Sequence, residues 1–208
     1  TNKGIPKEKI TVTGIPVSQR FTQNCGDKNA YKEALGLDRG RDYCLIMSGS
    51  MGYGDIYELT DKILESGIEN TSVIVICGNN QKYAGNGSVI SVGYTNRVDE
   101  YMKASSVVVT KPGGLSSTES MVCGVPLVLT KPIPGCDTEN FELLTKLGTA
   151  VGGTKPSEAA QKIKVILTNP DVAEQIVSMQ NKYISKTSAA DIAEAVLKGK
   201  IAQDEFVS

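Results

Sequence analysis

The sequence predicts an α/β domain, a Rossmann-like parallel sheet with helices on both faces. Short apolar runs, such as 43–47 and the three valines within 106–110, are typical of strands buried on both sides of a parallel sheet. Stretches between such runs carry apolar residues at helical spacing, for example Ile56, Leu59 and Ile63. The chain has 208 residues, 40% of them hydrophobic, which is enough for one domain with a sizeable core.

Strand and helix signals alternate in the first half of the chain. The β-branched run 10–13 ends at Gly14 and predicts a first strand, and a loop containing Phe21 follows it. Three continuous apolar runs, each followed by glycine within two residues, predict strands at 43–47, 73–77 and 89–92. Apolar residues at helical spacing predict helices at about 27–36, 56–64 and 98–102.

The second half continues this alternation and then becomes helical. Predicted strands at 106–110 and 125–129 enclose a helix from about 115 to 123. Further helices are predicted at about 138–147, 156–168, 171–184 and 188–198. Pro156 suits the first turn of its helix, and Ser188-x-x-Asp191 resembles a capping box. Ligands of open parallel sheets bind beyond the carboxyl ends of the strands, where this chain places its polar loops.

Composition excludes several classes of function. The net charge is −1, from 22 basic and 23 acidic residues, and aromatic residues make up only 5%, so nucleic-acid binding is not expected. No run of 18 apolar residues predicts a transmembrane helix. The five cysteines have no CxxC spacing, and Cys44 and Cys77 lie in apolar runs, so we expect buried thiols and a reducing, cytoplasmic setting. The chain has no histidine, the commonest general base near neutral pH.

The domain organisation predicted from the sequence has three parts. Residues 1–9 are polar, contain Gly4 and Pro6, and are expected to be a linker from a missing N-terminal domain. Residues 10–198 are expected to form one domain, and residues 199–208 a C-terminal tail. We therefore expect a fragment of a larger protein.

Residues 110–119 carry the strongest functional signal. Gly113 and Gly114 follow a β-branched run. After them comes a hydroxyl-rich segment that begins with Leu115 and Ser116 and ends in Glu119. Backbone N–H groups at a helix start bind phosphates, and a carboxylate one turn later accepts hydrogen bonds from a ribose diol. A purely structural alternative makes Ser116 or Ser117 the N-cap and Glu119 a first-turn acid.

A second polar cluster lies about twenty residues further on, after another predicted strand. Cys136, Asp137, Glu139 and Asn140 stand at a helix start and offer acceptors and an amide for sugar hydroxyls. Asp137 alone is also a plausible helix cap. Paired carboxylates are typical of glycoside hydrolysis as well, but the neighbouring phosphate-type loops favour an activated sugar.

Two further loops are candidates for nucleotide contact. Ser50, Met51 and Gly52 belong to a GxxGxG loop, which differs from the dinucleotide GxGxxG and is not followed by the expected acid after the next strand. A nicotinamide cofactor is therefore not expected, and the loop either faces phosphate or only turns the chain. Tyr94 is placed to stack on a base and the Val98 backbone to bond a uracil edge, with a surface turn as the alternative.

The chain contains no Asp-x-Asp motif, which many glycosyltransferases use to hold a diphosphate through a metal. Its absence favours binding without a metal or other cofactor, with the leaving diphosphate stabilised by helix dipoles, backbone N–H groups and Lys111. Arg97, near the predicted base-binding turn, is expected to be solvated.

Together these motifs resemble the C-terminal, donor-binding half of GT-B glycosyltransferases. The nearest group holds monogalactosyldiacylglycerol synthases, processive diacylglycerol glucosyltransferases and the N-acetylglucosaminyltransferase that completes lipid II. The similarity runs from about Lys9 to Leu197, and each motif is weak alone but specific as a set. Its parts are the TGIPV phrase at 13–17, the glycine-rich loop at 48–54, the uracil-binding segment at 93–104, the K-P-G…S/T…E element at 111–119 and the G-V-P at 124–126.

The resemblance implies roles for individual residues. Leu115 and Ser116 would face the diphosphate, Glu119 the ribose, and 135–140 the hexose, with Asn140 at the family's asparagine. One departure concerns the sugar. Lipid-glycosylating members typically have Gly-Gln-Glu where this chain has Gly135-Cys136-Asp137, so glucose, galactose and N-acetylglucosamine all stay open.

The resemblance also implies transfer of a hexose from a UDP-sugar to a lipid such as diacylglycerol, at the cytoplasmic membrane face. The lipid acceptor site, the catalytic base and most membrane contacts would belong to the missing N-terminal half. We therefore expect no catalytic residue in this fragment and no turnover by it alone. Two alternatives are a UDP-sugar 2-epimerase half-domain and a non-catalytic donor-binding subunit of a split glycosyltransferase.

Overall fold

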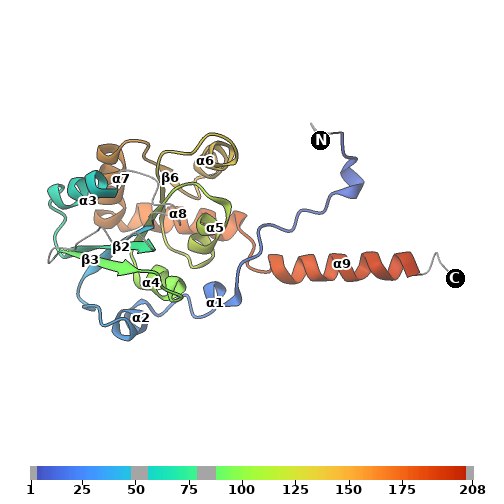
Figure 1. Ribbon diagram of the computed structural model, residues 1–208, viewed down its shortest axis with the longest axis horizontal. Helices are drawn as coiled ribbons and strands as arrows, with labels where there is room; N and C mark the ends of the chain where they lie inside the picture. Colours follow the sequence, from blue (N-terminus) through green and yellow to red (C-terminus); the bar gives the residue numbers. More distant parts are fainter. Residues whose placement is uncertain (1–3, 48–55, 79–87, 205–208) are drawn as a thin grey trace.

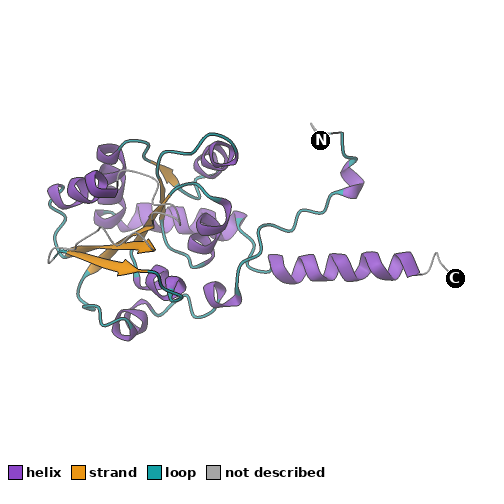
Figure 2. Cartoon of the chain, in the orientation of Figure 1, coloured by secondary structure: helices purple, strands orange, loops and turns teal. Residues whose placement is uncertain are grey.

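The computed structural model describes residues 4–47, 56–78 and 88–204 and contains a six-stranded parallel sheet. The strand order is β3-β2-β1-β4-β5-β6, and Figures 1 and 2 show the sheet enclosed by helices. The strands are β1 (Asp42–Met47), β2 (Thr71–Gly78), β3 (Val89–Gly93), β4 (Val107–Thr110), β5 (Leu127–Leu129) and β6 (Val151–Gly152). The order reverses between β1 and β4, and both halves extend outward from that point. The structure confirms the predicted fold class.

Helices connect the strands and cover both faces of the sheet. Between strands the chain forms α3 (Ile56–Glu65), α4 (Val98–Ala104), α5 (Gly114–Val122) and α6 (Cys136–Lys146). Before β1 it forms η1 (Lys7–Lys9), α1 (Gln19–Thr22) and α2 (Lys28–Ala34), and after β6 it forms α7 (Pro156–Thr168), α8 (Pro170–Tyr183) and α9 (Ser188–Asp204). None of the helices in the described ranges is both long and apolar enough to cross a membrane.

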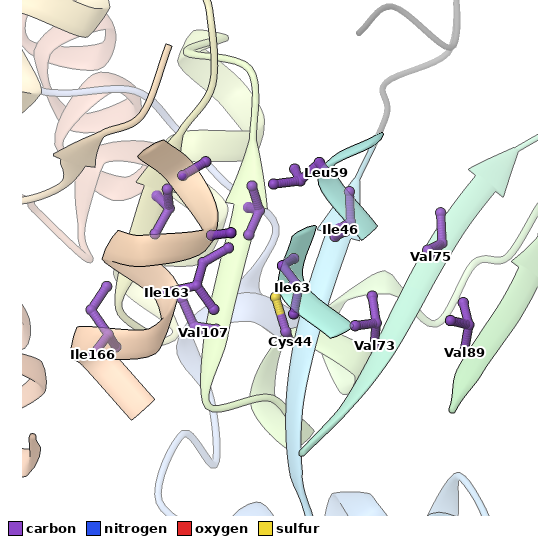
Figure 3. Close-up of a cluster of buried hydrophobic side chains, with 14 of the residues drawn as sticks. Cys44, Ile46, Leu59, Ile63, Val73, Val75, Val89, Val107, Ile163 and Ile166 are labelled. Carbon is purple, nitrogen blue, oxygen red and sulfur yellow. The ribbon is translucent and has the colours of Figure 1, made fainter. Parts of the chain in front are cut away.

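Alternation along the strands divides the core into two layers. Cys44 and Ile46 of β1 pack with α3 and α7 on one face of the sheet, a cluster drawn in Figure 3. Tyr43 and Leu45 belong to a second cluster, which includes buried side chains of α1, α4, α5 and α6. Neighbouring residues of a strand point to opposite faces, so a strand buried on both sides must be apolar throughout. Packing on both faces of the sheet therefore explains why the strands appear in the sequence as continuous apolar runs.

The predicted strand at 10–13 is wrong. These residues form no strand, and the Val12 side chain is 91% exposed. A β-branched sequence favours extended backbone, but a strand also needs a neighbour to pair with, and the sheet ends at β3 and β6. Figure 1 shows this segment running away from the sheet, on the same side of the molecule as α9.

Other helix and strand predictions differ mainly at the ends. The four-residue α1 and the two-residue β6 carry too few residues to show a period, and neither was predicted. The α9 helix continues to Asp204, beyond the predicted end at 198. At the start of α9 the Thr187 hydroxyl donates a hydrogen bond to Asp191 Oδ2 at 2.9 Å, so the partner of Asp191 is Thr187 rather than Ser188. The thiols of Cys44 and Cys77 are buried, as predicted.

Candidate functional site

The candidate site lies beyond the carboxyl ends of the strands, where the strand order reverses between β1 and β4. The loop after β4 leads into α5, and the loop after β5 leads into α6. The loop after β1 contains the predicted contacts Ser50, Met51 and Gly52, which lie outside the described residues. The described part of the site is therefore formed by β3, β4 and β5 with the helices that follow them.

The start of α5 differs from the serine-capped start that was the structural alternative. Gly113 is the N-cap and no side chain caps the helix, so neither Ser116 nor Ser117 has that role. The Ser117 hydroxyl is buried without a hydrogen-bond partner in the described structure, and Leu115 is 54% exposed beside it. The first N–H groups of a helix have no partner within the helix. At α5 they are left without a side-chain cap, beyond the carboxyl end of β4.

Glu119 lies on α5 one turn beyond its start and is partly buried. Within the described residues its carboxylate makes no hydrogen bond. Burial raises the pKa of this carboxyl above its usual value, the positive charge of Arg20 lowers that pKa, and the negative charge of Asp99 raises it further. A partly buried carboxylate without an internal partner is suited to accept hydrogen bonds from a ligand.

The second predicted cluster joins the first through two direct contacts. Lys111 Nζ lies 3.0 Å from Asp137 Oδ2, and Asn140 Nδ2 donates to Pro112 O at 3.0 Å. Asp137 is therefore paired with the loop after β4 and is not the N-cap of α6, a position held by Gly135. The two clusters that the sequence placed about twenty residues apart thus form one surface.

The other two members of the sugar cluster, Cys136 and Glu139, lie on the first turn of α6. Glu139 is exposed there. The backbone of Cys136 begins α6, but its side chain is outside the described structure. Gly135 has a φ of +112°, a conformation that other residues rarely adopt, so the turn before α6 requires glycine.

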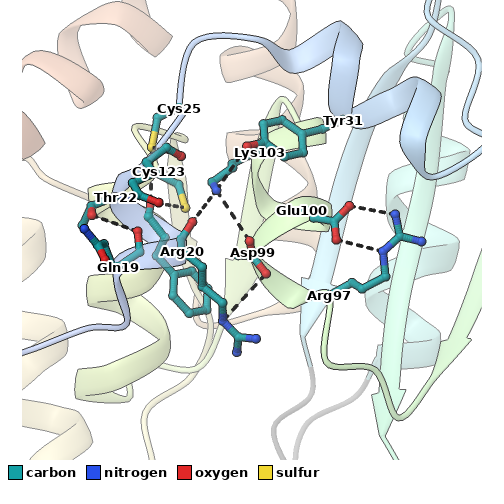
Figure 4. A network of polar contacts seen from close by, with 12 residues as sticks. Gln19, Arg20, Thr22, Cys25, Tyr31, Arg97, Asp99, Glu100, Lys103 and Cys123 are labelled. Atoms are coloured by element: carbon teal, nitrogen blue, oxygen red, sulfur yellow. Dashed lines mark hydrogen bonds and ion pairs between the residues drawn. The ribbon is translucent and has the colours of Figure 1, made fainter.

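The turn after β3 is the predicted base-binding segment. Tyr94 is 81% exposed and Val98 begins α4, so the ring is free to stack on a ligand. Arg97 is exposed, as expected, and it also has partners in the fold. Its guanidinium pairs with Glu100 at 2.7 Å and donates to Ala34 O at 2.9 Å. Figure 4 shows this pair at the edge of a larger polar network.

Two residues of the N-terminal segment reach the site and were not predicted. Arg20 Nη1 donates to Asn96 O, in the turn after β3, at 2.8 Å. Ile15 packs at the start of α5, where a Cβ added to Gly114 would lie 3.2 Å from Ile15 Cδ1. A side chain at position 114 would therefore press on Ile15, whose Cδ1 would have to shift by a few tenths of an ångström. The TGIPV phrase around Ile15 was the only sequence signal for this contact.

A cavity of about 530 Å³ lies at the same edge of the sheet, next to the sugar cluster. Its wall includes Lys111, Lys131 and Lys155 together with apolar residues of β1, β4 and α3. A hollow of about 640 Å³ lies at the opposite edge, near Asp42 and Ser106, and is lined by none of the predicted site residues. In the described ranges, no group of three or more His, Cys, Asp or Glu side chains is arranged to hold a metal ion.

Residues 52–183 match the protein family described as "Glycosyl transferases group 1". The chain belongs to this family. The match begins after β1, spans β2 to β6, and includes all the described site residues except those of the N-terminal segment. Membership therefore rests on the part of the chain that carries the site.

Curated relatives of this glycosyltransferase chain include two processive diacylglycerol β-glucosyltransferases. The protein from Bacillus subtilis (strain 168) is 27% identical over 215 residues, covering 99% of this chain and 54% of its own. The protein from Staphylococcus carnosus (strain TM300) is 29% identical over 195 residues, covering 88% of this chain and 49% of its own. The chain thus spans about half the length of these relatives, in agreement with the predicted half of a GT-B enzyme. Both names specify glucose, and neither supports galactose.

Solved structures confirm the fold at low sequence identity. The UDP-GlcNAc 2-epimerase from Neisseria meningitidis, bound to UDP-GlcNAc, has a TM-score of 0.72 at 18% identity, covering 95% of this chain and 57% of its own. WaaG, a glycosyltransferase of lipopolysaccharide biosynthesis, has a TM-score of 0.66 at 15% identity, covering 83% and 50%. Anabaena HepE in complex with UDP and glucose has a TM-score of 0.63 at 17% identity, covering 94% and 58%.

Proposed function

We propose that this chain is the donor-binding half of a glycosyltransferase that moves a hexose from a UDP-sugar to a membrane lipid such as diacylglycerol. One observation carries the proposal. The uncapped start of α5, with Glu119 one turn further on, lies beside the cluster at the start of α6, and the Lys111–Asp137 pair joins them at 3.0 Å. This arrangement supports a ribose acceptor, a phosphate site and a set of sugar acceptors that follow one another in the order of the parts of a UDP-sugar.

Each part of the donor has residues suited to it. The backbone at Gly113, Gly114, Leu115 and Ser116 would meet the diphosphate, and Lys111 would add a positive charge when the UDP leaves. Tyr94 and the Val98 backbone would hold the base. Ser50, Met51 and Gly52 remain proposed phosphate contacts from outside the described residues. No metal or other cofactor is part of this proposal.

The sugar would be recognised by the residues at the start of α6. Asp137 and Asn140 are partly buried and close to the loop after β4, and Cys136 and Glu139 are proposed to complete the set. Glucose is the hexose that the names of the relatives favour. The chemistry of a lipid acceptor, and peripheral attachment to the cytoplasmic face of a membrane, would belong to the half that the longer relatives have in addition.

The nucleotide part of the proposal is tested by titrating UDP into the chain and following backbone amide shifts by NMR. We expect shifts to gather at Gly113–Glu119 and at Tyr94–Val98 as UDP approaches millimolar concentration. Unchanged spectra at millimolar UDP would contradict nucleotide binding by this domain. Guanosine diphosphate is a suitable control, because it keeps the diphosphate but does not present the uracil edge.

Glu119→Ala provides the corresponding mutational test. The substitution removes charge-assisted hydrogen bonds to the ribose and should weaken UDP binding by about 1–3 kcal/mol, measured by calorimetry. Because burial already disfavours the ionised carboxyl, the variant should unfold at no lower temperature at neutral pH. Unchanged affinity would leave Glu119 as a helix-start residue only.

The two alternatives remain distinguishable by experiment. The structural likeness to the Neisseria meningitidis epimerase, with a TM-score of 0.72, favours testing UDP-sugar 2-epimerisation in the full-length protein without an acceptor. Epimerised UDP-sugar in that assay would overturn the transferase proposal. A donor-binding subunit of a split enzyme would instead bind UDP-sugar and act only when a separate acceptor chain is added.

A further inference from the structure

We propose that Arg20 of α1 is a positioning residue for the nucleoside end of the site, holding the turn after β3 in place for the base. The inference rests on the proposed function. Arg20 Nη1 donates to Asn96 O at 2.8 Å, and its Nε lies 3.8 Å from Asp99 Oδ1. One guanidinium therefore joins the base-binding turn to the first turn of α4.

Arg20 is itself held at both its side chain and its backbone. Asp99 is buried, and its second oxygen lies 3.5 Å from Lys103 Nζ, which is also buried. The same ammonium group donates to Arg20 O and to the hydroxyl of Tyr31, the latter at 3.4 Å. Figure 4 shows these groups pointing toward one another between α1, α2 and α4. A connected network of partly buried charges fixes geometry better than an exposed pair does.

The position of Arg20 also affects the charge of the proposed ribose acceptor. The charged groups that act on Glu119 are Arg20 from α1, which lowers the pKa of its carboxyl, and Asp99 from α4, which raises it. Lys103 on α4 pairs with that Asp99, and the Cys123 thiol lies at the end of α5 itself. Burial is the largest influence and favours the protonated form of Glu119. Arg20 therefore opposes the effect of burial on the pKa of Glu119 and favours its ionised form.

The Arg20 side chain is 50% exposed, so its remaining N–H groups face outward. A direct contact between these groups and phosphate is the competing explanation for any loss of UDP affinity. Uridine separates the two roles, because it contains the base and ribose but no phosphate. It also has no phosphate to titrate, so a pH profile of uridine affinity reports on the protein.

The experiment measures UDP and uridine affinity of the 208-residue chain with Arg20→Met, Arg20→Lys and the control Arg39→Met. Arg39 is an exposed arginine of the same size, paired only with Glu33 among the described ion pairs. We expect Arg20→Met to weaken both ligands alike, by about fivefold. As the pH is lowered, uridine affinity should fall when the Glu119 carboxyl is protonated. In Arg20→Met the midpoint of this fall should lie at a higher pH, because the pKa of Glu119 rises when the positive charge of Arg20 is lost. Arg20→Lys should restore the original midpoint but only part of the affinity.

The possible outcomes are distinct. Equal affinities and pH profiles for Arg20→Met and the unsubstituted chain would overturn the inference while leaving the proposed function intact. Weaker UDP with unchanged uridine would overturn it in favour of phosphate contact. If the unsubstituted chain binds no UDP, the proposed function fails and the inference fails with it. If Arg20→Met does not fold, as judged by circular dichroism, Arg20→Lys decides, and full affinity in that variant would contradict a role for the Asn96 hydrogen bond.

Discussion

At the nucleoside end of the site, Arg20, Asp99 and Lys103 connect helices to one another and leave the Glu119 carboxylate without a hydrogen bond in the described structure. At the sugar end, Lys111 and Asp137 are paired with each other. The first end is arranged by residues that would not bind the ligand. The second uses the proposed binding groups as its own internal contacts, so the proposed ligand would compete with those contacts. We therefore expect substitutions at the sugar end to change ligand preference more than substitutions at the nucleoside end.

The largest expected effect comes from disturbing the support of the sugar end alone. A Cβ added at Gly152 of β6 would lie 2.4 Å from Cζ of Phe141, next to Asn140 on α6. Gly152→Ala should therefore displace α6 and lower the free energy of unfolding by about 1–3 kcal/mol, measured by urea denaturation. The same variant should lose preference for UDP-glucose over UDP, with UDP affinity nearly unchanged.

A matched control for Gly152→Ala is Gly26→Ala, because a Cβ at Gly26 would meet no atom within 4 Å. This control should leave both stability and ligand preference unchanged. If Gly152→Ala weakened UDP as strongly as UDP-glucose, the two ends would be mechanically coupled, and the comparison between them would be wrong.

Features that depend on neighbouring residues could be predicted from the sequence, and features that depend on distant partners could not. The strands and most helices were predicted because a continuous apolar run or a helical period is a local signal. The strand at 10–13 was wrong because a strand depends on a partner elsewhere. The paired clusters at Gly113–Glu119 and 135–140 were predicted because both follow strands of one parallel sheet. Arg20 was missed because its partner Asn96 is 76 positions away and no periodicity marks such a contact.

The next effect concerns the Lys111–Asp137 pair, whose carboxylate side chain is only 14% exposed. Asp137→Asn removes the negative charge and frees Lys111 for the diphosphate, so UDP should bind more tightly, by about 0.5–1 kcal/mol. Recognition of glucose should weaken by about 1 kcal/mol, because a strong acceptor for sugar hydroxyls is lost. Calorimetry with UDP and with UDP-glucose measures both changes. Asp171→Asn, an exposed acid on the first turn of α8, is the control. Weaker UDP binding would show that Asp137 helps to place Lys111 rather than compete for it.

The smallest effect is expected at the rim of the nucleoside end, in the Arg97–Glu100 pair. The hydrogen bond from Arg97 lowers the pKa of the Glu100 carboxyl, so the pair stabilises the folded chain above the ordinary pKa of a glutamate and loses that contribution as the pH falls through the lowered value. Both side chains are partly exposed, so Glu100→Gln should cost about 0.5 kcal/mol or less at neutral pH, by urea denaturation, and nothing at a pH below both values. UDP affinity should not change.

The pKa of Glu119, one helix away, is shifted in the opposite direction from that of Glu100. Burial raises the pKa of Glu119, so its ionised form is a cost to folding. A loss of UDP affinity in Glu100→Gln would mean that the rim pair, and not only the Arg20 network, fixes the turn that holds the base.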